Sequence, residues 1–392
     1  MNILITSDTS VPGVGGMENA IVGLCNALIA QNHNVMLIAP HYDKKRENDD
    51  LYNFKIYRKW SIKIQQDQYL ANPFYTRKLD RIIKDFKPDI IHCHSQTSML
   101  IVALKIKKKY NIPCICTMHT KYSYNYNNNI KLKWVVKLMC KLIGNKLKKV
   151  DKLITVSKDF TKELAKYGYY DDFQVIKNGA NIEAKEYDEQ IKTLAIKKLN
   201  MNPKDNNLLF VGHISKIKNI DFIIDSLEIL YNTFPQFKLY LVGNGENEKY
   251  FQNRIASSVI KDNVVFTGVI MNKQLLSSIY YNSKLFLFPS IADNDSLTII
   301  EAATFETPSI TIESTGSSER ITNDVNGFII HNDVKDMTEK IEYLLKNQDI
   351  IKKVGLNAKN QLPKSWIDAS QEYLAVYNEV INKYKAKKIS KN

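Results

Sequence analysis

Residues 208–219 read LLFVGHISKIKN: an apolar run ends at a glycine and turns into a basic loop. Four consecutive apolar residues are typical of a strand that is buried on both faces of a sheet. The apolar spacing of residues 222–231 then predicts a helix after the loop. A strand followed by a helix is the repeating unit of a doubly wound α/β fold, in which ligands bind beyond the carboxyl ends of the strands. The basic loop therefore lies where such a fold binds its ligand.

Short apolar runs alternate with helical patterns along the whole chain, which predicts an α/β protein with two doubly wound parallel sheets. Polar residues 184–206 separate the two halves, so we expect an N-terminal domain at 1–183 and an interdomain connection at 184–206. The predicted strands are 3–6, 35–39, 90–92, 114–117, 153–156 and 175–176 in the first half, and 208–211, 238–242, 264–267, 285–288, 308–312 and 327–330 in the second.

The composition narrows the class of protein. A length of 392 residues suggests about two domains, and 44% hydrophobic with 24% charged residues is typical of a globular protein rather than a disordered chain. No run approaches the roughly 18 uncharged apolar residues of a membrane-spanning helix. Residues 1–5 lack the basic region and cleavage site of an export signal, so none is expected. Five cysteines suit a reducing cytoplasm better than a disulfide framework.

The positive charge is concentrated in one segment. Residues 101–150 contain twelve lysines and no acidic residue, so they supply +12 of the net charge of +14, which indicates an anionic partner. The segment includes a predicted helix with apolar residues on one face and lysines opposite. The apolar residues are Val135, Leu138, Met139 and Leu142, and the lysines are Lys133, Lys137 and Lys141. The helix either packs its apolar face on its own domain or lies on an anionic lipid surface. Nucleic acid is disfavoured because arginine is scarce and no recognition signature is present.

Glycines and histidines follow the strands of the first half. The turn at 12–18 contains Gly15 and Gly16 and leads into a helix, an arrangement that suits a phosphate, although its spacing is not that of a dinucleotide site. His92, His94 and His119 close two successive strands. With Cys93, Cys114 and Cys116 nearby they raise the possibility of zinc, but no C-x-x-C pair accompanies them and we expect no metal. His119 is the candidate for a ligand contact.

Four features cluster at strand ends in the second half: the basic loop with Lys218, the glycines at 243–245, the glycine at 268, and the loop 289–302. Together they offer backbone amides, a lysine and two carboxylates, Asp293 and Glu301, which lie eight residues apart. Amides and a cation would hold a diphosphate, and a carboxylate would accept hydrogen bonds from ribose or sugar hydroxyls.

These features belong to a longer ordered set of motifs, at 15–18, 89–94, 117–119, 176–179, 211–212, 242–245, 289–302, 318–321, 326–328 and 364–377. In this ordered set the chain resembles a family 4 glycosyltransferase of the GT-B fold over nearly its full length. The resemblance implies two Rossmann-like domains that face each other across a cleft, with an acceptor-binding N-terminal domain and a nucleotide-sugar-binding domain at 207–364. It also implies a helix at 365–392 that crosses back to the first domain.

The resemblance also implies roles for individual residues. Lys218 would stabilise the leaving diphosphate, Glu301 would bind the ribose, and Asp293 would contact the donor sugar. Gly16 would sit under the diphosphate and His119 beside the reacting sugar. The remaining donor-binding residues would be Gly15, His213, Asn244, Ile270, Asn294, Asp295, Ser296 and Leu297, with Lys133, Lys137 and Lys141 for the acceptor membrane.

Two positions depart from the family's usual pattern. His213 stands where the family usually has arginine, so a fixed cation is replaced by a group that titrates near neutral pH. Asp293 is the first carboxylate of the E-x7-E motif, and Asn294-Asp295-Ser296 replaces the usual Gly-Phe-Gly. The charge at Asp293 is kept, but both departures bear on the donor sugar.

The expected activity is a retaining, metal-independent transfer of a hexose from a nucleoside-diphosphate sugar, with UDP favoured by family frequency and no cofactor. The acceptor would be a lipid, a lipid-linked glycan or a cell-envelope polysaccharide at the cytoplasmic face of the plasma membrane. The alternatives are a non-catalytic binding protein for polyanions or membrane surfaces, a GT-B sugar-nucleotide epimerase, a phosphorylase, and a nucleotide-dependent oxidoreductase. The oxidoreductase is disfavoured because neither half contains G-x-G-x-x-G.

Overall fold

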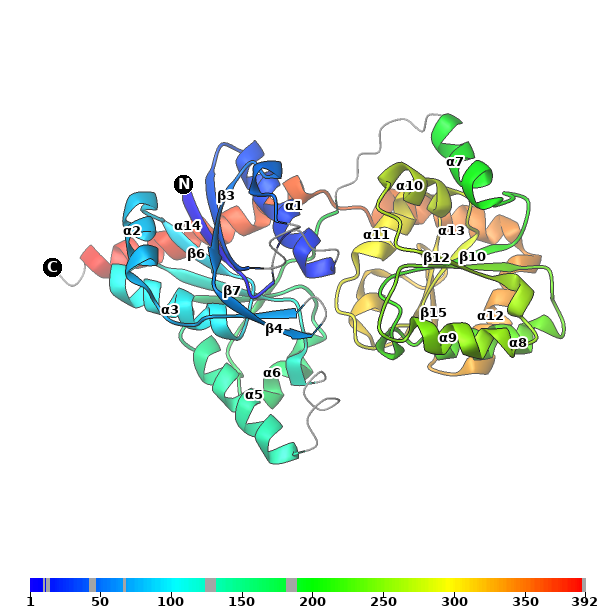
Figure 1. The fold of residues 1–392 in the computed structure, drawn as a ribbon, viewed down its shortest axis with the longest axis horizontal. Coiled ribbons are helices and arrows are strands. Elements are labelled where there is room, and N and C mark those ends of the chain that lie inside the picture. Colours follow the sequence, from blue (N-terminus) through cyan, green and yellow to red (C-terminus); the bar gives the residue numbers. More distant parts are fainter. Residues whose placement is uncertain are drawn as a thin grey trace. The chain divides into compact units, whose positions relative to one another are not determined.

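The structure is a computed structural model that describes residues 1–9, 11, 15–41, 47–65, 68–123, 132–180 and 189–389. The chain forms two compact units (Figure 1). Unit 1 comprises Met1–Asn181 together with Lys364–Asn392, and unit 2 comprises Ile182–Pro363.

Unit 1 contains a seven-stranded parallel sheet. Its strands are β1 (Asn2–Thr6), β2 (Asn34–Pro40), β3 (Lys55–Lys59), β6 (Ile90–Cys93), β7 (Cys114–Met118), β8 (Lys152–Thr155) and β9 (Gln174–Val175), and β4 (Ser61–Gln65) and β5 (Gln68–Ala71) form a separate antiparallel pair. The order is β3-β2-β1-β6-β7-β8-β9. The helices are α1 (Gly16–Ala30), η1 (Asp49–Leu51), α2 (Arg77–Phe86), α3 (Ser98–Tyr110), α5 (Lys133–Leu147), α6 (Phe160–Lys166) and α14 (Trp366–Ile389).

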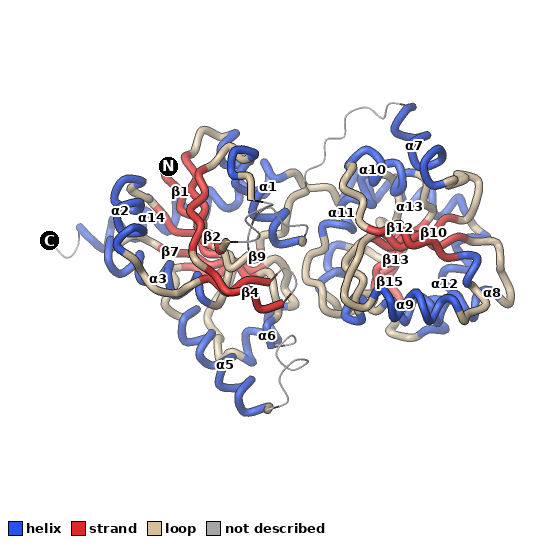
Figure 2. Tube along the Cα trace, viewed as in Figure 1, coloured by secondary structure: helices blue, strands red, loops and turns tan. Residues whose placement is uncertain are grey.

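Unit 2 contains a six-stranded parallel sheet. Its strands are β10 (Asn207–Val211), β11 (Lys238–Val242), β12 (Val264–Gly268), β13 (Leu285–Phe288), β14 (Ser309–Ile312) and β15 (Phe328–Ile330), in the order β12-β11-β10-β13-β14-β15. The helices are α7 (Glu189–Leu199), η2 (Lys216–Lys218), α8 (Ile220–Tyr231), α9 (Glu248–Ala256), η3 (Lys261–Asn263), α10 (Lys273–Tyr281), α11 (Leu297–Thr304), η4 (Gly316–Arg320), α12 (Val334–Lys346) and α13 (Gln348–Gln361). Figure 2 shows the strands as a central layer, with α10 and α13 on one side and α8, α9 and α12 on the other.

Both sheets confirm the predicted doubly wound fold. Strands such as β10 and β13 are buried along their whole length because helices cover both faces of the sheet. Apart from Asn207 at the start of β10, both strands are therefore apolar. The strand order reverses between β1 and β6 in unit 1 and between β10 and β13 in unit 2. At such a switch point the loops that follow the two strands diverge, and they leave room for a ligand at the carboxyl edge.

The structure contains strands that the sequence did not predict. Strand β3 lies at the edge of its sheet, and β4 and β5 form a separate antiparallel pair, so none of the three has the continuous apolar run of a central strand. The segment 184–206 is more than a connection. Its helix α7 packs on α10 in unit 2, where the Ser278 hydroxyl accepts a hydrogen bond from the Ala195 amide at 2.8 Å. Ala195 is fully buried, which anchors this otherwise polar segment.

The last helix, α14, packs on α1 within unit 1. Gly23 permits this close approach, because a Cβ atom at that position would lie 2.2 Å from Nε1 of Trp366. The Tyr377 hydroxyl reaches the centre of the unit and bonds Nδ1 of His92 at 2.7 Å. Among the described residues, no helix combines the length and the hydropathy that crossing a membrane requires.

Candidate functional site

The switch point of unit 2 brings a lysine and a carboxylate together. Lys218 ends η2, which follows β10, and Asp293 lies in the loop that follows β13. The Lys218 Nζ atom lies 2.6 Å from Oδ1 and 2.7 Å from Oδ2 of Asp293. Both side chains are partly exposed, at 20% and 24%, so the pair is open to solvent at the edge where this fold binds ligands.

Local backbone geometry places Lys218 at this edge. Asn219 follows η2 with φ of 60°, in the left-handed region that asparagine tolerates better than most residues, and it directly precedes α8. The Asn219 side-chain amide donates to the carbonyl of Pro289 at 3.2 Å, which ties the basic loop to the loop after β13.

The glycines of this edge let two loops meet backbone to backbone. Gly243 has φ of 133°, and a Cβ atom there would lie 1.9 Å from the carbonyl oxygen of Gly212. A Cβ atom at Gly245 would lie 2.3 Å from the carbonyl oxygen of Ile214. The amide of Ile214 donates to the carbonyl of Asn244 at 2.8 Å. These glycines therefore shape the loops, and the exposed Asn244 lies between them.

The loop between β13 and α11 is held from two sides. Asp293 contacts Lys218, and Asp295 contacts Arg320 of η4, with Nε to Oδ1 at 2.5 Å and Nη2 to Oδ2 at 2.8 Å. The Asp295 and Arg320 side chains are only 3% and 7% exposed. Because the Asp295 carboxylate is buried against an arginine, only the backbone of this predicted donor-binding residue remains for a ligand. Sequence reasoning treated Arg320 only as part of a motif, since nothing in the pattern pairs it with Asp295.

Glu301 lies in α11 and has an unusual environment for a carboxylate. The Tyr280 hydroxyl donates to Glu301 Oε2 at 3.0 Å. Burial disfavours the charged form and raises the pKa of Glu301 to about 6, although the Tyr280 hydrogen bond acts in the opposite direction. A carboxylate with an accessible proton equilibrium near neutral pH is typical of a functional site.

The other predicted donor-binding residues of unit 2 follow β10, β12 and β13. Nε2 of the half-exposed His213 lies 2.5 Å from Oε2 of Glu246, so a carboxylate contacts the histidine that replaces the usual arginine. Ile270 is partly buried against the core. Ser296 and Leu297 are partly buried at the start of α11, Asn294 is buried, and the Ser296 hydroxyl lies 2.8 Å from that of Thr298.

In unit 1 the three histidines form a chain of contacts, in which the rings of His92 and His94 lie 4.0 Å apart between their centres. His92 Nε2 lies 2.7 Å from the Thr117 hydroxyl, and His94 Nδ1 lies 2.9 Å from His119 Nε2. Burial lowers the pKa of both His92 and His94 well below the usual histidine value, so both rings are neutral. The described part of the chain contains no group of three His, Cys, Asp or Glu side chains arranged to hold a metal ion.

The glycine turn of unit 1 is described from Gly15 onward, and residues 12–14 lie outside the described residues. Gly15 precedes α1, and a Cβ atom there would collide with the Glu18 carboxylate at 2.2 Å. Gly16 is the first residue of α1, and a Cβ atom there would meet none of the described residues within 4 Å. Packing against the described part of the protein therefore does not explain the glycine at position 16.

Helix α5 does not pack on unit 1 through the predicted apolar face. The residues that pack on unit 1 form a different stripe, Val136, Cys140, Ile143, Gly144 and Leu147. Leu138 and Leu142, which belong to the predicted apolar face, are each 50% exposed, and Trp134 is 67% exposed. Helix α5 has two apolar stripes, so periodicity alone could not decide which one is buried. The solvent face of α5 therefore combines exposed apolar residues with the exposed Lys133, Lys137 and Lys141.

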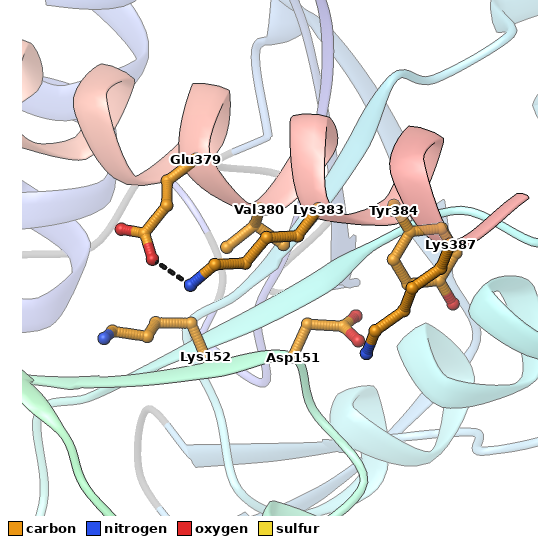
Figure 3. Close-up of a pocket in the computed structure, with 7 residues that line it drawn as sticks. All are labelled: Asp151, Lys152, Glu379, Val380, Lys383, Tyr384 and Lys387. Atoms are coloured by element: carbon orange, nitrogen blue, oxygen red, sulfur yellow. Dashed lines mark hydrogen bonds and ion pairs between the residues drawn. The ribbon is translucent and has the colours of Figure 1, made fainter. Parts of the chain in front are cut away.

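Unit 1 also has a small hollow, which lies away from the three histidines. Figure 3 shows it between α14 and the start of β8, where Lys383 pairs with Glu379. Asp151 and Lys152 line the hollow at the amino end of β8, whereas the histidines lie at the carboxyl ends of β6 and β7. The hollow is therefore not the ligand edge of the sheet.

Two family models match the chain, one on each half. Residues 14–184 match the family model Glycosyltransferase Family 4, and residues 191–361 match Glycosyl transferases group 1. The chain is 23% identical over 375 residues to alpha-monoglucosyldiacylglycerol synthase of Acholeplasma laidlawii. The matched region covers 91% of this chain and 92% of that protein.

Solved structures share the fold. Alr3699/HepE of Anabaena in complex with UDP has a TM-score of 0.77 at 15% identity, covering 97% of this chain and 100% of that one. Sucrose-phosphate synthase of Thermosynechococcus elongatus has a TM-score of 0.76 at 17% identity, covering 97% and 99%. With a family match on each half, and lysine, carboxylate and glycine loops at the carboxyl edge of unit 2, the chain belongs to the family 4 glycosyltransferases of the GT-B fold.

Proposed function

We propose that this glycosyltransferase transfers a hexose from a UDP-sugar, with retention of anomeric configuration and without a metal ion, to a lipid, a lipid-linked glycan or a cell-envelope polysaccharide. The observation that carries the proposal is the Lys218–Asp293 pair at the switch point of unit 2. Two comparisons favour this choice of substrates. The Acholeplasma relative is named for the synthesis of a glucosyl lipid, and the Anabaena neighbour was solved with UDP-glucose.

The chemistry follows from where charge develops. As the bond between the anomeric carbon and the diphosphate breaks, negative charge grows on the phosphate oxygens and positive charge on the sugar. The Lys218 ammonium stabilises the negative charge on the phosphate oxygens. The amides at the start of α11 stabilise the same charge, because a helix N-terminus favours an anion. The Asp293 carboxylate offers its oxygens to the sugar. A lysine in this position supplies the charge that a metal ion would otherwise supply, which supports metal-independent transfer. The roles predicted for Gly16 and His119 stay predictions.

The donor is tested by thermal unfolding of the purified protein with UDP, GDP, ADP, CMP, NAD and NADP. We expect UDP alone to raise the midpoint by several degrees, because a ligand that binds only the folded state stabilises it by mass action. A selective response to another nucleoside diphosphate would change the donor class. A response to NAD or NADP alone, or to none of the six, would contradict the proposed donor site.

We further propose that α5 binds the anionic inner surface of the plasma membrane and so brings the enzyme to its acceptor. Trp134, Leu138 and Leu142 offer apolar area, and the exposed Lys133, Lys137 and Lys141 add charge. Such a combination of basic and apolar residues is typical of a helix that lies in a membrane interface.

Replacing Lys137 with glutamine should lower binding to phosphatidylglycerol vesicles about fivefold, because each lysine near an anionic surface contributes about 1 kcal/mol. The measurement is vesicle sedimentation at fixed ionic strength. Lys353→Gln, a change at an exposed lysine of α13, serves as the control and should leave binding unchanged. Equal binding of wild type to phosphatidylcholine and phosphatidylglycerol vesicles would contradict the electrostatic role of α5.

A further inference from the structure

Two ion pairs hold one short loop at the ligand edge of unit 2. The loop joins β13 to α11 and contains Asp293 and Asp295, two residues apart. Lys218 approaches Asp293 from the loop after β10, and Arg320 approaches Asp295 from η4, the segment after β14. The loop after β13 is thus joined to the loops that follow its two neighbours in the sheet, β10 and β14. The two pairs differ in burial, because the Lys218 pair is partly exposed while the Arg320 pair is buried.

Both the side chain and the backbone of the Arg320 segment are held in place. Its guanidinium meets the Asp295 carboxylate with two parallel hydrogen bonds, at 2.5 Å and 2.8 Å, a geometry that fixes direction as well as distance. A reciprocal cap between Thr315 and Ser318 stabilises η4. The backbone of η4 also packs directly on the loop, since a Cβ atom at Gly316 would lie 2.4 Å from the carbonyl oxygen of Asn294.

Stability alone does not account for this pair. Burying two charges is costly, and apolar side chains of similar volume often stabilise a fold at least as well. What a bidentate pair adds is a fixed orientation.

We propose that Arg320 is a positioning residue for the donor sugar. Through Asp295 it fixes the part of the loop that presents Asp293 to the donor sugar, and it thereby sets the affinity for the sugar and the choice between donor sugars without touching the donor. The inference rests on the proposed function, because it assumes that this loop binds the sugar of the donor.

The test compares Arg320→Lys, which keeps the charge but loses the two-pronged contact, with wild type. UDP-glucose is the probe for KM and kcat, and UDP alone is the probe for Kd by calorimetry. We expect the KM for UDP-glucose to rise about tenfold while the Kd for UDP changes less than twofold, because UDP lacks the sugar that the loop holds. The ratio of turnover with UDP-glucose to that with UDP-galactose should also move toward one.

Arg254→Lys is the matched control. Arg254 forms ion pairs with Asp221 and Asp225 in the same unit but away from the loop, so the variant makes the same chemical change at a structural site. It should leave KM unchanged. A second variant, Asp295→Asn with Arg320→Gln, carries no buried charge and keeps the inference testable if Arg320→Lys fails to fold. We expect the same rise in KM.

The outcomes separate the two proposals. If wild type turns over UDP-glucose and neither variant at Arg320 changes its KM relative to Arg254→Lys, the positioning role is wrong and the proposed function stands. A parallel rise in the Kd for UDP would show a general loss of the site, which also overturns the inference. If wild type neither binds UDP nor turns over any of the sugar nucleotides, the proposed function fails and the inference fails with it.

Discussion

We expect replacement of Lys218 with alanine to lower kcat at least about 100-fold and to leave the protein folded. The magnitude is that of removing one preorganised donor from a site where negative charge develops in the transition state. The fold should tolerate the change because Lys218 and Asp293 are both partly exposed, and ion pairs near solvent contribute little to stability. The loss should appear mainly in kcat, since the interaction strengthens as the diphosphate leaves.

The measurement is steady-state turnover of UDP-glucose with circular dichroism and thermal unfolding as checks of folding. Lys216→Ala is the matched control, because Lys216 lies in the same short helix η2 but its ammonium lies over the Tyr250 ring, 4.3 Å from the ring centre. It should retain nearly full activity. A Lys218→Ala protein with a rate near that of wild type would remove Lys218 from the catalytic machinery, whatever the result for Lys216.

The sequence predicts the two sheets well because their strands are buried on both faces. Residues 208–211 of β10 and all of β13 are apolar, and a glycine or proline directly follows each strand. These signals are local and need no knowledge of the partner strand. Strand β3, with the sequence KIYRK, carries no such signal, because it forms the edge of its sheet and is only partly buried. Its assignment depends on pairing with β2, which is a tertiary contact.

The candidate site is predictable to the same extent. Lys218 and Asp293 follow strands whose carboxyl ends meet at the switch point, so topology alone brings their loops together. The pairing of Asp295 with Arg320 depends on side-chain packing between residues 25 positions apart, and no periodicity encodes it. Helix α5 shows the same limit, since packing rather than sequence selects which of its two apolar stripes is buried.

Replacing Glu301 with glutamine should weaken donor binding and stabilise the protein at the same time. If Glu301 binds the ribose, the substitution replaces a charged acceptor of hydrogen bonds with a neutral one. Hydrogen bonds to charged groups contribute about 1.5–3 kcal/mol, so we expect the Kd for UDP to rise about thirtyfold. Isothermal titration calorimetry at pH 7.5 measures this change, and Glu339→Gln, at a largely exposed glutamate of α12, is the control.

The effect on stability has the opposite sign and depends on pH. Burial raises the pKa of Glu301 in the folded state to about 6, above the value of 4.5 that an unperturbed glutamate has. Between these values the folded state binds more protons than the unfolded state, so the free energy of unfolding falls as pH rises from about 4.5 to 6. Above pH 6 the ionised Glu301 therefore lowers the free energy of unfolding by about 1–2 kcal/mol, since each pKa unit corresponds to about 1.4 kcal/mol and the side chain keeps some contact with solvent.

Glu301→Gln should unfold at a higher urea concentration than wild type at pH 7.5 and at nearly the same urea concentration at pH 4.5. A carboxylate kept at such a cost is explained by a ligand that needs its charge, so a variant that binds UDP as tightly as wild type would contradict the role of Glu301 even if the stability profile agreed.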